Sequence, residues 1–194
     1  MKYIASFAAL LLLCGFALPA WGAAYGNPVP HLKAGDIGIG LAANEARETL
    51  FFDYAPIDSG TIRLLLGQFE HGSAEGEDIG LGYRHNVLGF DAAGQEVHLG
   101  LLAEYRQGEV DAHGHTESFS QLDLVAGFGT EMFEVLAPYV GFVWREVTVE
   151  DESEVESGPM LGLDYIPFHS LVIGVEYLFG FEEEDIAAFV EFVF

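Results

Sequence analysis

Cysteine, positive charge and long apolar runs are all scarce in this sequence. Cys14 is the only cysteine among 194 residues, so the remainder of the chain has no disulfide, no thiol nucleophile and no thiolate metal ligand. Seven lysines and arginines stand against 31 aspartates and glutamates, and the formal charge of −24 argues against nucleic acid as a partner. After residue 24, no apolar run reaches the roughly 20 residues of a transmembrane helix.

The N-terminus has the layout of a secretory signal. Lys2 supplies a positive charge, Ala5–Leu18 forms an apolar core, and small residues follow at Ala20, Gly22 and Ala23. This order predicts a cleaved signal peptide over residues 1–23. A lipoprotein signal is the alternative, but the bulky leucine before the cysteine disfavours it because lipoprotein signals have a small residue there.

Apolar residues make up 51% of the sequence, and after residue 35 they alternate with polar ones. Alternation with a period of two predicts strands, and helical periodicity is absent. We therefore expect a lead-in over residues 24–35 and one all-β domain over residues 36–194. Ten strands are expected, at Asp36–Ala43, Thr49–Ala55, Gly60–Phe69, Asp78–Val87, Glu96–Arg106, Phe119–Gly129, Pro138–Val149, Met160–Ile166, Leu171–Phe181 and Asp185–Phe194.

Two kinds of connection take turns between these strands. The expected acidic loops are Asn44–Glu48, Glu70–Glu77, Gly108–Glu117, Glu150–Ser157 and Glu182–Glu184. The less charged connections are Pro56–Ser59, Leu88–Gln95, Thr130–Ala137 and Pro167–Ser170. Short turns at one end and longer outer loops at the other are typical of an antiparallel transmembrane β-barrel. The pattern predicts such a barrel of about ten strands, with eight as the alternative.

Within the strands, one face is apolar and the other carries glycine and paired charges. The charges on this second face are Arg63, Arg84, Glu104, Arg106, Asp123, Arg145, Asp164, Glu176 and Glu191. In a soluble barrel these residues would face water, whereas in a membrane barrel they would line the lumen and the apolar face would contact lipid. Alternation alone does not decide between the two.

Three features favour the membrane barrel. Aromatic residues end the apolar face near the strand ends, as interfacial girdles require, at Tyr83, Tyr105, Trp144, Tyr165, Tyr177 and Phe181. Glycines on the charged face would make room for long side chains inside a narrow barrel. Arginines on that face are comparable in number to the acids, and a closed interior needs near balance because an unpaired buried charge costs several kcal/mol. We therefore interpret the nine charged residues as a lumenal network.

The last eight residues, Ala187 to Phe194, alternate and end in an aromatic residue on the apolar face. This segment, including Phe192 and Phe194, resembles the C-terminal strand that the assembly machinery of bacterial outer-membrane proteins recognises. With the export signal, the chain resembles the small OmpA/OmpX-type barrels. The opening Asp36-Ile37-Gly38-Ile39-Gly40-Leu41 and the glycine-dotted strands are more particularly similar to the YfaZ-like family. The resemblance implies a barrel in the bacterial outer membrane and no defined mechanism.

Few residues are candidates for chemistry. Asp111, His113, His115 and Glu117 could bind zinc or copper, because imidazoles two residues apart project together from an extended chain. A solvated loop without supporting contacts is the alternative reading of this cluster. His169-Ser170 could suggest a hydrolase of the lipid A deacylase kind, but neighbours in sequence do not form a triad by themselves and a plain turn explains the pair.

The sequence therefore predicts a small, monomeric, non-enzymatic outer-membrane barrel without a cofactor. Its expected partners are outer-membrane lipid, lipopolysaccharide, the assembly machinery and divalent cations at the acidic loops; nucleic acid is not expected. Its expected role is envelope integrity or surface interaction. A narrow channel for a small solute or cation is the first alternative, and a lipid-modifying enzyme is the second.

Overall fold

The computed structural model describes residues 25–29, 31–71, 74–112, 115–130, 135–149, 152–180 and 185–194. The predicted signal peptide lies outside this part of the chain. Among the described residues, no helix is long and apolar enough to cross a membrane.

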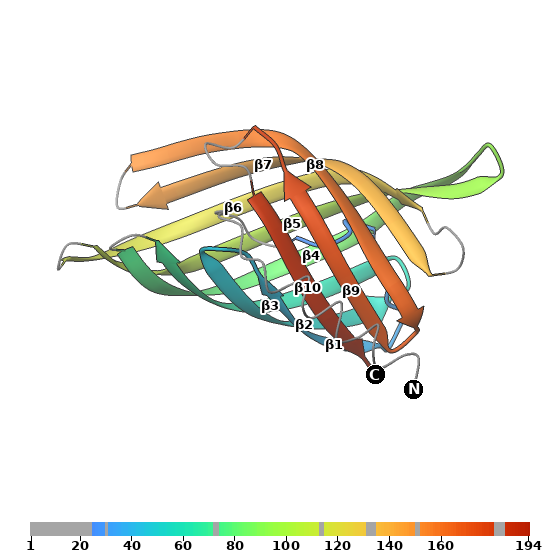
Figure 1. Cartoon of the computed structure of the whole chain (residues 1–194), viewed down its shortest axis with the longest axis horizontal. Coiled ribbons are helices and arrows are strands. Elements are labelled where there is room, and N and C mark those ends of the chain that lie inside the picture. The colour runs from blue at the N-terminus through green and yellow to red at the C-terminus, as the bar shows by residue number, and fades with distance from the viewer. Residues whose placement is uncertain are drawn as a thin grey trace.

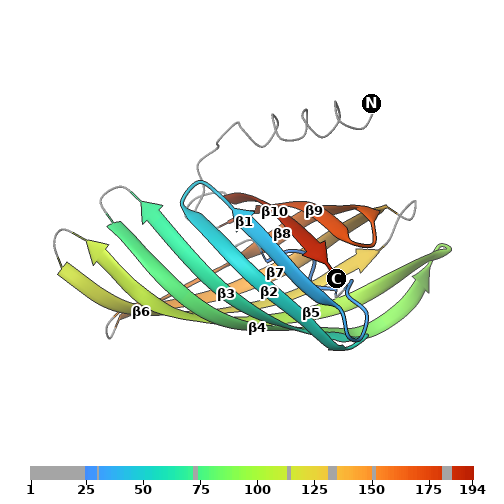
Figure 2. The same ribbon diagram turned by 90° about the horizontal axis from the view of Figure 1, so that it is seen from below.

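Ten antiparallel strands close into a single barrel (Figure 1). Their bounds are β1 Ile37–Ala43, β2 Arg47–Ile57, β3 Gly60–His71, β4 Ala74–Ala92, β5 Gln95–Ala112, β6 His115–Thr130, β7 Leu136–Val149, β8 Glu152–Phe168, β9 Leu171–Leu178 and β10 Asp185–Val193. The prediction of an all-β antiparallel barrel of ten strands is confirmed, and the alternative of eight strands is wrong. Each strand pairs with its neighbours in sequence, and β1 pairs with β10 to close the ring (Figure 2).

Several strands are longer than the sequence predicts. β4 and β5 have 19 and 18 residues, which at about 3.3 Å per residue gives roughly 60 Å. The predicted acidic loops Glu70–Glu77, Gly108–Glu117 and Glu150–Ser157, and the predicted connection Leu88–Gln95, are in large part strand. These loop predictions are wrong because polar side chains also occur on a strand that continues past the apolar band with both faces in water. The β4–β5 connection is a two-residue turn, Ala93-Gly94, with positive φ at both residues.

The barrel has two different ends. At the acidic end, β1 joins β2, β3 joins β4, β5 joins β6 and β7 joins β8. The opposite end carries the turns at Asp58-Ser59, Ala93-Gly94 and His169-Ser170, together with the last residue, Phe194. We call it the turn end.

Side-chain burial is inverted relative to a water-soluble barrel. Large apolar side chains cover the outer wall, as in Leu81, which is 59% exposed, and Phe142, which is 52% exposed. Charged side chains fill the interior, where Glu104 and Arg106 are both 0% exposed. Exposed large apolar side chains occur on all ten strands, whereas soluble monomers rarely expose contiguous apolar patches of more than a few hundred Å².

Candidate functional site

The structure places all nine charged residues of the expected lumenal network inside the barrel, each at most 6% exposed. It adds three more charged residues that the sequence analysis did not assign. Arg47 and Asp53 lie on β2, and Asp78 lies on β4. The two on β2 share the inward phase of Phe51. Arg47 was missed because the expected second strand began at residue 49, whereas Asp53 lay within that strand and alternation alone would have placed it inside. Asp78 shares its inward phase with Gly80 and Gly82. It was not assigned because it directly follows an expected acidic loop and is itself an acid.

Arg63 forms the best-paired ion pair of the lumen. Its Nε and Nη2 both donate to the Asp53 carboxylate at 2.7 Å, in a bidentate arrangement across the β2–β3 pair. Its Nη1 lies 3.8 Å from Glu104, and its guanidinium lies 4.1 Å from the centre of the Phe51 ring. A buried charge with this many partners holds its rotamer, so Arg63 ties its own strand β3 to β2 and to β5.

A second cluster extends toward the acidic end. Arg106 donates to Asp78 at 3.2 Å and to Glu104 at 3.4 Å. Arg47 approaches the same Asp78 carboxylate at 3.2 Å and donates to Gln121 at 3.4 Å. This chain of contacts joins β2 to β6 across the lumen. The interior at this level is therefore occupied by side chains rather than open.

Arg145 completes the network on the opposite wall. Its Nε donates to Asp123 at 2.9 Å, and the second oxygen of that carboxylate accepts a hydrogen bond from Gln121. Asp123 and Arg145 are direct register partners on β6 and β7. The pair therefore combines a cross-strand contact with a charge-assisted hydrogen bond in a water-poor interior.

Most of the described segment before β1 lies inside the barrel: residues 25–28 and Leu32 are buried, whereas residues 33–35 are exposed where the chain leaves toward β1 (Figure 1). We call residues 25–35 the plug, of which residues 25–29 and 31–35 are described. Tyr25 is 0% exposed, and its carbonyl oxygen accepts hydrogen bonds from Arg63 at 3.1 Å and from Arg84 at 2.6 Å. Its hydroxyl accepts a hydrogen bond from Arg145. Three arginines from three strands thus converge on one residue of the plug.

The backbone nitrogens of the plug meet a carboxylate on β9. Glu176 accepts the Tyr25 N–H at 2.6 Å and the Gly26 N–H at 2.8 Å, one on each oxygen. The Tyr139 hydroxyl donates to the same group at 3.2 Å. Farther along the plug, His31 lies 3.2 Å from Glu191 on β10. The sequence analysis treated residues 24–35 only as a lead-in, and no periodicity in so short a segment signals its position.

Lumenal glycines provide the space for the plug. A Cβ on Gly100 would overlap the carbonyl oxygen of Pro28, and one on Gly127 would lie 2.7 Å from Pro28 Cγ. A Cβ on Gly129 would lie 2.9 Å from the Asn27 side chain. Other inward glycines make room for side chains, as Gly162 does for Tyr139. The inward glycines therefore make room both for the charged side chains of the lumen and for the plug.

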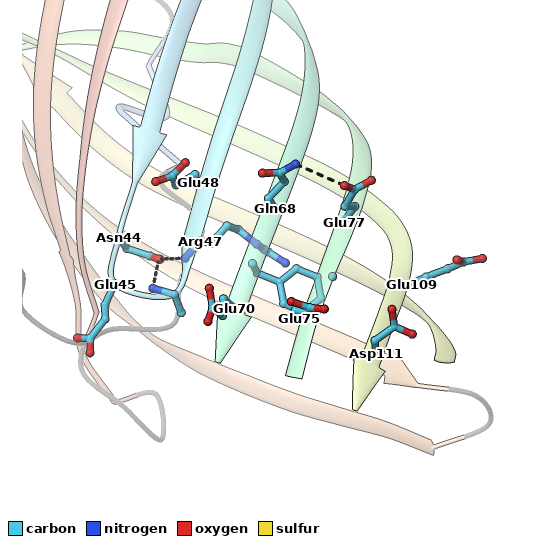
Figure 3. Close-up of a pocket in the computed structure, with 13 residues that line it drawn as sticks. Asn44, Glu45, Arg47, Glu48, Gln68, Glu70, Glu75, Glu77, Glu109 and Asp111 are labelled. Atoms are coloured by element: carbon cyan, nitrogen blue, oxygen red, sulfur yellow. Dashed lines mark hydrogen bonds between the residues drawn. The ribbon is translucent and has the colours of Figure 1, made fainter. Parts of the chain in front are cut away.

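An open cavity of about 690 Å³ lies at the acidic end (Figure 3). Seven acidic residues line it, namely Glu45, Glu48, Glu70, Glu75, Glu77, Glu109 and Asp111. Arg47 also lines the cavity, with its guanidinium 5.4 Å from the centre of the Phe69 ring. The cavity is therefore a mouth with an acidic rim above the Arg47–Asp78 pair.

The predicted metal ligands are not assembled into a cluster in the described part of the chain. Asp111 and His115 are exposed on β5 and β6, and Asp111 accepts a hydrogen bond from Thr116. Glu117 pairs in register with Val110, and His113 lies outside the described residues. The metal site stays a prediction.

Two further sequence features lie at the turn end. Phe192 and Phe194, the expected assembly signal, are 51% and 77% exposed on the outer wall of β10 and at the chain end. His169 lies in the β8–β9 turn with Nε2 3.3 Å from Asp36, and this exposed contact involves no serine.

The fold and its contents define a ten-stranded antiparallel barrel with an apolar outside and a charged, plugged inside. No family model matches the chain, and no curated protein matches it in sequence. The YfaZ-like resemblance stays a prediction.

Among solved structures, the chain is similar to three outer-membrane barrels. The first is the N-terminal β-barrel domain of Pseudomonas aeruginosa OprF, with 11% identity over 84% of this chain and 100% of that one, at a TM-score of 0.43. The second is the KdgM porin, with 8% identity, 82% and 99% coverage and a TM-score of 0.44. The third is the translocator domain of the autotransporter NalP from Neisseria meningitidis, with 10% identity, 86% and 90% coverage and a TM-score of 0.41. Similarity at this level carries no information about a ligand or an activity.

Proposed function

We propose that this protein is a non-enzymatic barrel of the bacterial outer membrane whose lumen is closed by its own N-terminal segment. The observation that carries the proposal is the inverted burial: the outer wall is apolar while seven carboxylates and five guanidinium groups lie inside. Such a wall is stable in lipid, whereas in water it would favour aggregation. The outer-membrane location and the monomeric state are parts of this proposal.

The role we propose is structural or adhesive rather than conductive. The Arg47–Gln121 hydrogen bond joins β2 to β6 across the lumen, and the plug occupies the space beside Gly100, Gly127 and Gly129. In this proposal the acidic end faces the cell exterior, so its exposed carboxylates form the extracellular surface. Beside lipopolysaccharide, they would share the divalent cations that bridge lipid phosphates, which supports a role in envelope integrity.

Membrane extraction and gel migration test the location. We expect the mature chain in the outer-membrane fraction, and we expect it to migrate differently unheated and boiled because a detergent-resistant barrel unfolds only on boiling. A known outer-membrane barrel in the same fraction serves as the control. A chain found in the soluble fraction, with one mobility before and after boiling, would contradict the proposal.

Conductance tests the plug. Purified wild-type protein in a planar bilayer should show no stepwise current. Gly100→Ala should produce current, because the added methyl overlaps the backbone of Pro28, and not a charged side chain, and so displaces the plug. Gly141→Ala is the matched control, since its methyl would meet Ala126 and Met160 instead of the plug. Stepwise current from the wild type would favour the alternative function, a narrow channel for a small solute or cation.

A further inference from the structure

We propose that the exported chain is cut between Ala24 and Tyr25 and that the new α-ammonium group of Tyr25 is held inside the barrel by Glu176. The inference rests on the export that the proposed function assumes. It shifts the end of the signal by one residue from the expected 1–23. The N-terminus of the mature protein would then form a buried ion pair with a lumenal carboxylate.

The Tyr25 nitrogen occupies a site suited to a positive charge. It lies 2.6 Å from Glu176 Oε1, and the side chains of both residues are almost completely buried. The other oxygen of the carboxylate accepts the Gly26 N–H and the Tyr139 hydroxyl. An ammonium at this nitrogen would convert an ordinary amide hydrogen bond into a charge-assisted one in a water-poor site, where such bonds are strongest.

The charge balance of the lumen supports the same conclusion. Seven carboxylates lie inside, those of Asp53, Asp78, Glu104, Asp123, Asp164, Glu176 and Glu191. Five guanidinium groups face them, those of Arg47, Arg63, Arg84, Arg106 and Arg145. His31, 3.2 Å from Glu191, can supply a sixth positive charge, and the α-ammonium of Tyr25 would be the seventh. Unbalanced buried charge is unfavourable, so a positive charge at Tyr25 would stabilise a lumen that holds more carboxylates than guanidinium groups.

The sequence before Tyr25 fits the cut. Gly22 and Ala24 would occupy the third and first positions before the broken bond, and a signal peptidase requires small residues at both. The reaction is hydrolysis of one peptide bond by water. Ala24 leaves with the new carboxylate on the signal peptide, and Tyr25 keeps the nitrogen, which takes up a proton to become the ammonium.

The first experiment determines the N-terminal residue of protein taken from the outer-membrane fraction, by intact mass and N-terminal peptide sequencing. The expected first residue is Tyr25. Any other first residue, or an uncut chain, overturns the inference. Because conductance is measured independently, a non-conducting barrel that begins elsewhere would overturn this inference and leave the proposed function standing.

The second experiment probes the burial of the ammonium with an amine-acetylating reagent. A chain that begins at Tyr25 contains two amines, its own α-amine and the side chain of Lys33, because Lys33 is the only lysine after Lys2. Lys33 is exposed and serves as the internal control. In the folded barrel we expect acetylation of Lys33 and none of Tyr25, and acetylation of both after boiling. Equal labelling of both amines in the folded barrel would overturn the inference.

A variant then tests Glu176 itself. Glu176→Gln should expose the α-amine of Tyr25 to acetylation while leaving the labelling of Lys33 unchanged. Glu154→Gln, at an exposed position on β8, is the matched control and should leave Tyr25 protected. Tyr25 that stays protected in a folded Glu176→Gln barrel would show that Glu176 does not hold the ammonium. If this variant does not fold, the labelling of the wild-type barrel still decides the question.

Discussion

Arg145→Leu is expected to lower the free energy of unfolding of the barrel by about 3–5 kcal/mol, the cost of leaving a buried charge without its partner. The substitution leaves the Asp123 carboxylate, which is 0% exposed, with the Gln121 amide but without the guanidinium. It also removes the hydrogen bond to the Tyr25 hydroxyl. The measurement is the urea midpoint of the unfolding transition in lipid vesicles, followed by the mobility shift on gels.

The double variant Arg145→Leu/Asp123→Leu is the control for this prediction. Removing both charges should restore much of the lost stability, because two apolar residues of suitable volume replace an ion pair at little cost. The two positions are direct register partners, so the leucines would face each other. A mild effect of Arg145→Leu alone, below about 0.5 kcal/mol as is usual at surface positions, would show that Arg145 is not lumenal.

Leu81→Arg is expected to lower the free energy of unfolding in lipid by about 1–4 kcal/mol, because arginine on the lipid-facing wall of a barrel costs about 2–4 kcal/mol at the bilayer midplane and less toward the interfaces. Leu81 is 59% exposed on the outer wall of β4, where it pairs with Leu64 on one side and with Tyr105 on the other. In a water-soluble barrel the same exposed position would tolerate arginine within about 0.5 kcal/mol. Unfolding in lipid vesicles measures the difference.

Glu77→Arg provides the comparison on the same strand and the same face. Glu77 lies nearer the acidic end, in the wall of the open cavity, so the guanidinium would be in water. We expect a change within about 0.5 kcal/mol. Equal effects of Leu81→Arg and Glu77→Arg would mean that the outer wall does not contact lipid.

The sequence predicted the architecture because a barrel strand obeys a local rule. On β3, the outward residues Ile62, Leu64 and Leu66 alternate with the inward residues Arg63 and Leu65, so the phase of each side chain is readable without knowledge of its neighbours. The same rule gave the number and order of the strands. It failed at strand ends, as at Gly108–Glu117. There both faces of the strand are in water, so apolar and polar residues do not alternate.

The pairing within the lumen was not readable from the sequence. Alternation assigns Arg145 to the inside but does not say that it meets Tyr25, which lies 120 residues earlier in the chain. The plug itself has no repeating pattern, and its position depends on gaps left by Gly100 and Gly127 on other strands. Contacts of this kind join residues that are far apart in the sequence, so they are a property of the tertiary structure alone.

The pairing of β1 with β10 also constrains the order of assembly. These strands stand at opposite ends of the domain, so their pairing is the most non-local contact of the wall and carries a high cost in chain entropy. The plug directly precedes β1, and Tyr25 contacts both Arg63 on β3 and Glu176 on β9. The plug thus bridges the two halves of the wall, so its contacts help to offset the entropy cost of closing the seam.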